Sequence, residues 1–252
     1  MAELRLRDSL HARVLSRIDD CLAGLDDQAL LFKGEALARQ VYPQSWLRQR
    51  TDIDLWVRPE HLAAMVDGLR DRGCRLTAGV SSRFARFELV LDAGMSVPVG
   101  IDVHVRPFFR PWRLPHLDFE RVLAQSVPCP DWPRLYRPGA ADALVLAAVH
   151  LDKNAHQRAI WLYDLFLLGA DPDTRARAMA EAQKSGEGPV LARGLAWADY
   201  LFGGGDCPTE APTRVPGKLS ALWRDARALP DWTARGVFLA ELLGIGVHRW
   251  KP

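Results

Sequence analysis

The sequence predicts a mixed α/β (α+β) fold, in which a sheet-containing N-terminal part is followed by a C-terminal helical domain. Up to about residue 105, short apolar stretches of strand length alternate with segments whose apolar residues recur at helical spacing. Residues 106–138 are rich in proline, and the pattern from residue 139 onward is helical. We therefore expect an α/β core over residues 1–115 and a helical domain over residues 116–252.

Composition is that of an ordinary globular protein. The 252 residues are 48% hydrophobic and 25% charged, and they suffice for one large domain or two small ones. The formal net charge of +2 is too small to indicate nucleic-acid binding by itself. No apolar run approaches the length that crosses a bilayer, so we expect no membrane partner.

The cysteines and the first residues of the chain both favour a cytoplasmic location. Cys21, Cys74, Cys129 and Cys207 lie far apart and form no Cys-x-x-Cys pair. We expect free thiols in a reducing compartment and no zinc site. The first residues are charged and amphipathic, which differs from the pattern of a signal peptide.

The individual elements follow from apolar periodicity and from the positions of proline and glycine. Helical spacing predicts helices over residues 3–24, 34–41 and 60–72. Strand patterns cover residues 28–33, 52–57, 74–78, 83–92 and 97–105. We interpret residues 106–138 as a connecting segment with a short helix at 117–125. Later helices are expected over residues 139–152, 157–169, 172–185, 187–202, 214–228 and 231–247.

Two features near the N-terminus point to phosphate and metal chemistry. The first predicted strand ends in Lys33-Gly34, and a glycine between a strand and a helix lets backbone N–H groups approach a phosphate closely. In the next strand, Asp52 and Asp54 share one face because successive side chains alternate. Carboxylates at this spacing raise each other's pKa unless a cation lies between them, and they suit Mg²⁺. This is the layout of a phosphoryl- or nucleotidyl-transfer site.

A third acid, Asp102, lies in the otherwise apolar strand at 97–105. A carboxylate in such a strand is costly unless it is paired, hydrogen-bonded or bound to a metal. Asp102 can therefore act as a metal ligand or as a general base. His104 shares its strand face, and a structural His–Asp hydrogen bond is the alternative interpretation.

These residues resemble the uncharacterised nucleotidyltransferase family of the DNA polymerase beta-like nucleotidyltransferase superfamily. The similarity covers roughly residues 10–170. The matching segments are Lys33-Gly34-x-x-Leu37, Tyr42-Pro43, Leu47-Arg48-x-x-x-Asp52-Ile-Asp54-Leu55, Ile101-Asp102-Val103-His104, and His150…His156 with Trp161-Leu-Tyr-Asp164.

The resemblance implies a nucleotidyltransferase-type mixed sheet core and a Mg²⁺-dependent enzyme. It would transfer a nucleoside monophosphate from a nucleoside triphosphate, with ATP the expected donor, to a hydroxyl of a small-molecule, peptide or protein acceptor. Asp52, Asp54 and Asp102 would be the catalytic and metal-binding acids. The expected nucleotide contacts are Lys33, Gly34, Arg48, His104 and Lys153. Arg48 matches the family position and is expected to bind the triphosphate, whereas Arg50 does not match.

Some expectations leave alternatives open. Glu35 stands where the family usually has a small residue, and beside a phosphate it would repel the anion unless it turns outward. Lys153 and His150 are either nucleotide contacts or parts of a polar network between the two halves, and for Asp164 we favour the structural role. The alternative functions are a toxin-like RNA nucleotidyltransferase, which the low net charge disfavours, and a non-catalytic nucleotide-binding module.

Overall fold

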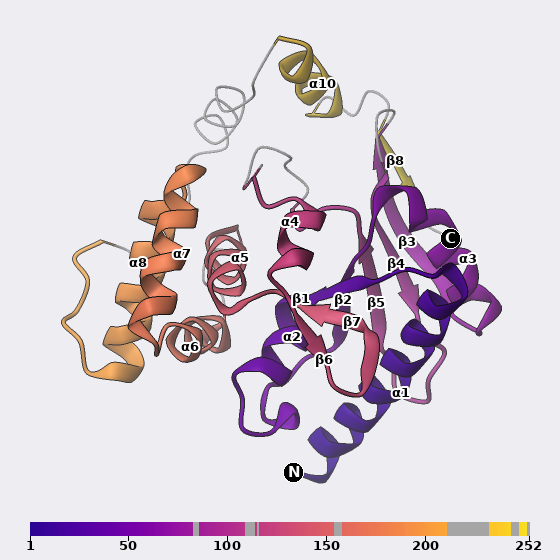
Figure 1. Cartoon of the computed structure of the whole chain (residues 1–252), viewed down its shortest axis with the longest axis horizontal. Helices are drawn as coiled ribbons and strands as arrows, with labels where there is room; N and C mark the ends of the chain where they lie inside the picture. The colour runs from indigo at the N-terminus through magenta and orange to yellow at the C-terminus, as the bar shows by residue number, and fades with distance from the viewer. Residues whose placement is uncertain are drawn as a thin grey trace.

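The computed structural model describes residues 1–82, 86–108, 114, 116–153, 158–210, 232–242 and 247–250. A twisted central sheet carries helices on both faces, and a layer of helices from the C-terminal half extends away from one face (Figure 1). The predicted α+β class, a mixed sheet followed by helices, is confirmed. No helix within the described ranges is long and apolar enough to cross a membrane.

The sheet has eight strands in the order β6-β7-β1-β2-β5-β4-β3-β8. Its strands are β1 (Ala29–Phe32), β2 (Asp52–Trp56), β3 (Arg75–Ser82), β4 (Arg86–Asp92), β5 (Gly100–His104), β6 (Val127–Cys129), β7 (Trp132–Arg137) and β8 (Val247–Trp250). The pairs β2–β5 and β1–β7 are parallel, and all other neighbours are antiparallel. The strands that carry the predicted site, β1, β2 and β5, are therefore adjacent in the middle of the sheet.

One face of the sheet packs against α1 (Ala2–Leu25) and α3 (Leu62–Asp71), the second of which follows the short 3₁₀ helix η2 (Pro59–His61). Strand residues with odd numbers supply this face. Leu31, Ile53, Leu55, Ile101 and Val103 are all fully buried in one cluster with the apolar residues of both helices. Because the side chains alternate, the even-numbered residues of β2 and β5 must face the other way.

The opposite face packs against α2 (Lys33–Gln40), α4 (Phe119–Ala124) and α5 (Ala140–Lys153). Phe32 and Trp56 anchor it, with ring centroids 6.2 Å apart. Beyond α5 lie α6 (Ala159–Leu168), α7 (Pro172–Lys184) and α8 (Gly188–Ala198), which continues into the π-helix η3 (Asp199–Gly203). The helix α10 (Trp232–Leu242) follows later in the chain. The predicted acids thus face the helical layer.

Three strands were not predicted. Residues 106–138 were interpreted as a connection with one helix, and α4 is found as expected, but β6 and β7 also lie there. The prolines of β6 and β7 argued against strands in this segment. Pro128 lies in β6 at the edge of the sheet, and Pro133 lies in β7 before Leu135 and Tyr136, the residues that pair with β1. Proline is tolerated in these two places.

The predicted helix over 231–247 was too long. It ends at Leu242, and Val247 begins β8, which pairs with β3 and forms the edge of the sheet. A local pattern does not reveal a partner strand about 170 residues away. The predicted helix over 214–228 lies outside the described residues. The division at residue 115 remains a prediction, and β6, β7 and β8, which follow it, belong to the same sheet as the earlier strands.

Candidate active site

The turn from β1 into α2 has an unusual backbone. Phe32 is extended and caps the helix, and Lys33 follows with φ of 51°, in the left-handed region. A β-carbon on Gly34 would lie 2.8 Å from Nη1 of Arg48 and 3.6 Å from Cβ of Arg50. A side chain at position 34 would therefore collide with the Arg48 guanidinium where it now lies. This is a second reason for glycine here, in addition to the predicted approach of the backbone to a phosphate.

The parallel register of β2 and β5 brings the acids together. Asp54 is paired with Asp102, and Trp56 with His104, two residue pairs further along the strands. Single donor atoms of Asp54, Asp102 and His104 all lie within 4.8 Å of one another. Asp52 and Asp54 lie two residues apart on the same face, and both line a cavity together with Asp102. The predicted convergence of three acids from neighbouring strands is therefore found.

Asp54 and Asp52 have opposite electrostatic surroundings. Nζ of Lys33 lies 2.5 Å from Oδ1 of Asp54, and Nε2 of His104 lies 3.1 Å from the same oxygen. Burial raises the pKa of Asp54, but Lys33 and His104 outweigh it and hold that pKa well below the usual value. Asp54 is thus ionised, and His104 donates its Nε2–H to it. For Asp52, burial and the charge of Asp54 raise the pKa above its usual value.

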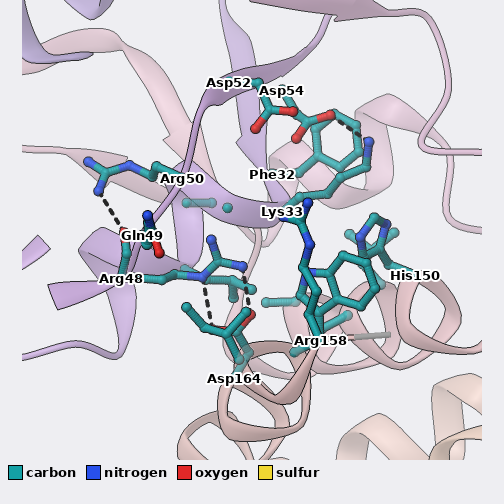
Figure 2. Close-up of a pocket in the computed structure, with 18 of the residues that line it drawn as sticks. Phe32, Lys33, Arg48, Gln49, Arg50, Asp52, Asp54, His150, Arg158 and Asp164 are labelled. Atoms are coloured by element: carbon teal, nitrogen blue, oxygen red, sulfur yellow. Dashed lines mark hydrogen bonds and ion pairs between the residues drawn. The ribbon is translucent and has the colours of Figure 1, made fainter. Parts of the chain in front are cut away.

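These side chains line a cavity of about 690 Å³ between the sheet and the helical layer (Figure 2). The volume is within the range of small-molecule and cofactor sites. On the strand side it is lined by Phe32, Lys33, Gly34, Thr51, Asp52, Asp54 and Asp102, and on the helix side by Ala143, Leu146, Ala147, His150, Arg158, Ile160, Trp161 and Asp164. The strand side carries the three acids beside Lys33, and the other wall combines apolar side chains with His150, Arg158 and Asp164.

The donor set on the strand side fits a divalent cation. Carboxylate oxygens of Asp54 and Asp102, with Asp52 two residues along β2, are the hard ligands that Mg²⁺ takes in proteins. His104 bonds to Asp54 and can hold that carboxylate in orientation, as residues behind a metal ligand commonly do. Asp54, Asp102 and His104 are the residues whose ligand atoms lie close enough together to hold a metal, and the part of Asp52 as a further ligand remains a prediction.

Arg48, predicted to bind the triphosphate, is paired with a carboxylate. Its Nε donates to Oδ1 of Asp164 at 2.9 Å and its Nη2 to Oδ2 at 2.7 Å, while the hydroxyl of Tyr42 donates to Oδ1 at 2.8 Å. Both residues of this bidentate pair, Arg48 and Asp164, are buried. The contact joins the segment before β2 to α6, as the structural role predicted for Asp164 requires. Arg48 still lines the cavity, where Nη1 lies beside Gly34.

Glu35 turns inward rather than outward. It is completely buried and binds Arg50, Arg39 and Nδ1 of His11, the last at 2.8 Å. Arg50 in turn donates to Asp8 at 2.5 Å. Burial raises the pKa of Glu35, but His11 and the two arginines outweigh it and keep that pKa far below its usual value. The Glu35 carboxylate therefore does not act as the uncompensated charge that would repel a phosphate, because its buried basic partners neutralise it.

The helical side differs from the prediction in its basic residues. Lys153 is exposed at the end of α5 and is not among the residues found to line the cavity, and His156 lies outside the described residues. His150 does line it, and burial, followed by the charge of Lys33, lowers the pKa of His150 to about 3. Arg158 and Trp161 were missed as cavity residues. Trp161 and Asp164 lie three residues apart on α6, a spacing that could have indicated Trp161, whereas Arg158 precedes the helix and no helical pattern indicated it.

A sequence model of a family described as uncharacterised nucleotidyltransferase matches residues 1–203. A search of curated proteins found no match. The matched region includes all the strands and helices that surround the cavity. Because the match covers well over half of the chain, this protein belongs to the uncharacterised nucleotidyltransferase family.

Proposed function

We propose that this protein transfers a nucleoside monophosphate from a nucleoside triphosphate, with ATP as the expected donor, to a hydroxyl group. The acceptor is expected to be a small molecule, a peptide or a protein, and the expected setting is the cytoplasm. The observation that carries the proposal is the convergence of Asp52, Asp54 and Asp102 on one cavity, beside the turn that begins α2. Membership of a nucleotidyltransferase family supports the same reaction class.

The roles of the side chains follow from their surroundings. Asp52, Asp54 and Asp102 would hold Mg²⁺, which when bound supplies charge neutralisation at the phosphates and acidifies a nearby hydroxyl. Asp54 stays ionised through Lys33 and His104, so it is ready to bind a cation at neutral pH. Asp102, less buried than Asp54, is placed to accept the proton of the acceptor hydroxyl.

In the proposed step the acceptor oxygen attacks the α-phosphorus and its proton passes to Asp102. The bond from the α-phosphorus to the bridging oxygen breaks, and pyrophosphate leaves. Lys33 and the backbone N–H groups at Gly34 are the groups expected to stabilise the charge that develops on the phosphates. For Lys33 to do so, its ammonium must move from Asp54 toward the triphosphate, a rotation that its long flexible side chain permits.

The test is transfer of label from [α-³²P]ATP, in Mg²⁺, to candidate small molecules, peptides, the protein itself and RNA. Asp52→Asn and Asp54→Asn should reduce transfer by at least about a thousandfold if these acids act as proposed. Asp67→Asn, which removes an exposed carboxylate from α3, is the matched control and should keep full activity. Label in RNA alone would favour the toxin-like alternative. Mg²⁺-dependent ATP binding without transfer to any acceptor would favour a non-catalytic module.

Glu35 no longer supports the non-catalytic alternative. In the sequence it was the residue that argued against efficient phosphate binding. Its carboxylate is buried with Arg50, Arg39 and His11 and does not line the cavity in the described part of the chain. The protein therefore departs from its family at this position without introducing an uncompensated negative charge beside the phosphates.

A further inference from the structure

Arg158 is a basic residue of the cavity to which the sequence analysis assigned no role. It is the residue that immediately precedes α6, it is exposed, and it lines the wall opposite the acids. Figure 2 shows its side chain extending from the helical wall toward the side of the cavity that carries Lys33. The guanidinium is therefore directed at the space between the two walls.

The side chain of Arg158 is supported by an aromatic ring. Its guanidinium carbon lies 5.5 Å from the centroid of the Trp161 ring, within the distance of a cation–π contact. Trp161 is itself held, because the His150 ring packs edge-on against it with centroids 4.9 Å apart. An arginine held in this way loses less freedom on binding a ligand than an unsupported surface arginine would.

Charge pairing distinguishes Arg158 from the other basic residues of the cavity. Arg48 is bound to Asp164, Arg50 to Glu35 and Lys33 to Asp54. Among the residues that the structure describes, no carboxylate forms an ion pair with Arg158. Burial and the charges of Lys33, Lys153 and Arg48 lower the pKa of His150 to about 3 against the opposing charge of Asp54, so positive charge predominates around this side chain.

We propose that Arg158, supported by Trp161, binds the terminal phosphates of the nucleoside triphosphate from the wall opposite Asp52 and Asp54. This inference rests on the proposed function and adds to it a second anchor for the donor. Arginine presents a planar set of N–H donors that binds phosphate oxygens in pairs. With Mg²⁺ held by the acids of the strand wall and Arg158 on the helix wall, the polyphosphate would have a positive charge on each side. Arg158 then also stabilises the pyrophosphate that leaves.

The test is calorimetric titration of the full-length protein with three probes in Mg²⁺: α,β-methylene ATP, which resists transfer, pyrophosphate and AMP. Arg158→Ala should weaken α,β-methylene ATP and pyrophosphate by about tenfold to a hundredfold, the range of hydrogen bonds to charged groups. AMP lacks the terminal phosphates and should bind within about twofold of wild type. Arg158→Lys should be intermediate, because it keeps the charge but not the paired donors.

Arg177→Ala is the matched control, because Arg177 is an exposed arginine on α7 that does not line the cavity in the described part of the chain. It should leave all three titrations unchanged. Equal loss of affinity for AMP would overturn the assignment to the terminal phosphates. Unchanged affinity of Arg158→Ala for α,β-methylene ATP would overturn this inference alone. If the wild-type protein itself bound no triphosphate, this inference and the proposed function would both fail.

Discussion

The buried pair of Arg48 and Asp164 allows a quantitative test of which role Arg48 has. Asp164→Ala removes both acceptors of the bidentate contact and also the acceptor of the Tyr42 hydroxyl. Arg48 is only 5% exposed, so water does not replace the lost partner fully. The variant therefore leaves a buried charge unpaired between the strand core and α6.

Removing one partner of a buried ion pair typically costs about 3–5 kcal/mol. For a protein of this size, 1 kcal/mol shifts the melting temperature by about 2–4 °C, so the expected decrease is about 6–20 °C. Urea unfolding followed by tryptophan fluorescence gives the free energy directly. Tyr42→Phe, which removes a hydroxyl and leaves the ion pair intact, should cost only about 1 kcal/mol.

A double variant separates pairing from simple loss of packing. Arg48→Met with Asp164→Leu replaces both charges by apolar side chains and should recover most of the stability lost in Asp164→Ala. The control is Asp67→Ala, which breaks an exposed pair with Arg70 and should change stability little. If Asp164→Ala lowered the free energy of unfolding no more than Asp67→Ala, the ion pair of Arg48 and Asp164 would not stabilise the fold. Arg48 would then be primarily a ligand-binding residue.

Three further predictions follow from the same region. Glu35→Gln should lower the free energy of unfolding by about 3 kcal/mol at pH 7. Because the folded-state pKa of Glu35 is lowered, this loss of stability relative to wild type should shrink as the pH falls below about 4.3. Urea titrations that show no such decrease would contradict the buried pairing with Arg50. Gly34→Ala should cost about 1–3 kcal/mol in thermal unfolding because Arg48 is held in place, and an equally stable variant would show that Arg48 moves freely. Excess EDTA should abolish label transfer and added Mg²⁺ should restore it, except in Asp54→Asn; transfer that survives chelation would refute the metal role.

Sequence alone located the acids because strand alternation is a short-range rule. Asp52 and Asp54 had to share a face, and the apolar neighbours of Asp102 predicted a buried strand beside them. The order of strands that makes β2 and β5 neighbours came from the family resemblance rather than from any local pattern. Once that order is given, the meeting of Asp54 and Asp102 follows from the register.

Other features of the site depend on contacts between segments far apart in the chain, and local sequence patterns could not predict them. The partners of Glu35 are His11, Arg39 and Arg50, so its inward orientation depended on α1 and on the segment before β2 as well as on α2 itself. The pairing of Arg48 with Asp164 joins positions 116 residues apart in the chain. The strands β6 and β7 were missed because Pro128 and Pro133 indicated a connecting segment, although proline is tolerated in an edge strand and near the start of a strand.

The side-by-side register of β2 and β5 makes this site sensitive to chain length in one place and tolerant in another. Deleting one residue inside β5 would turn the carboxylate of Asp102 toward the apolar layer under α1 and α3 and present an aliphatic side chain to Asp54. The turn before β5, with Gly94, Ser96 and Pro98 exposed, can lengthen without shifting that alignment. Natural variation in length among related chains should therefore collect in this turn and avoid the five residues of the strand.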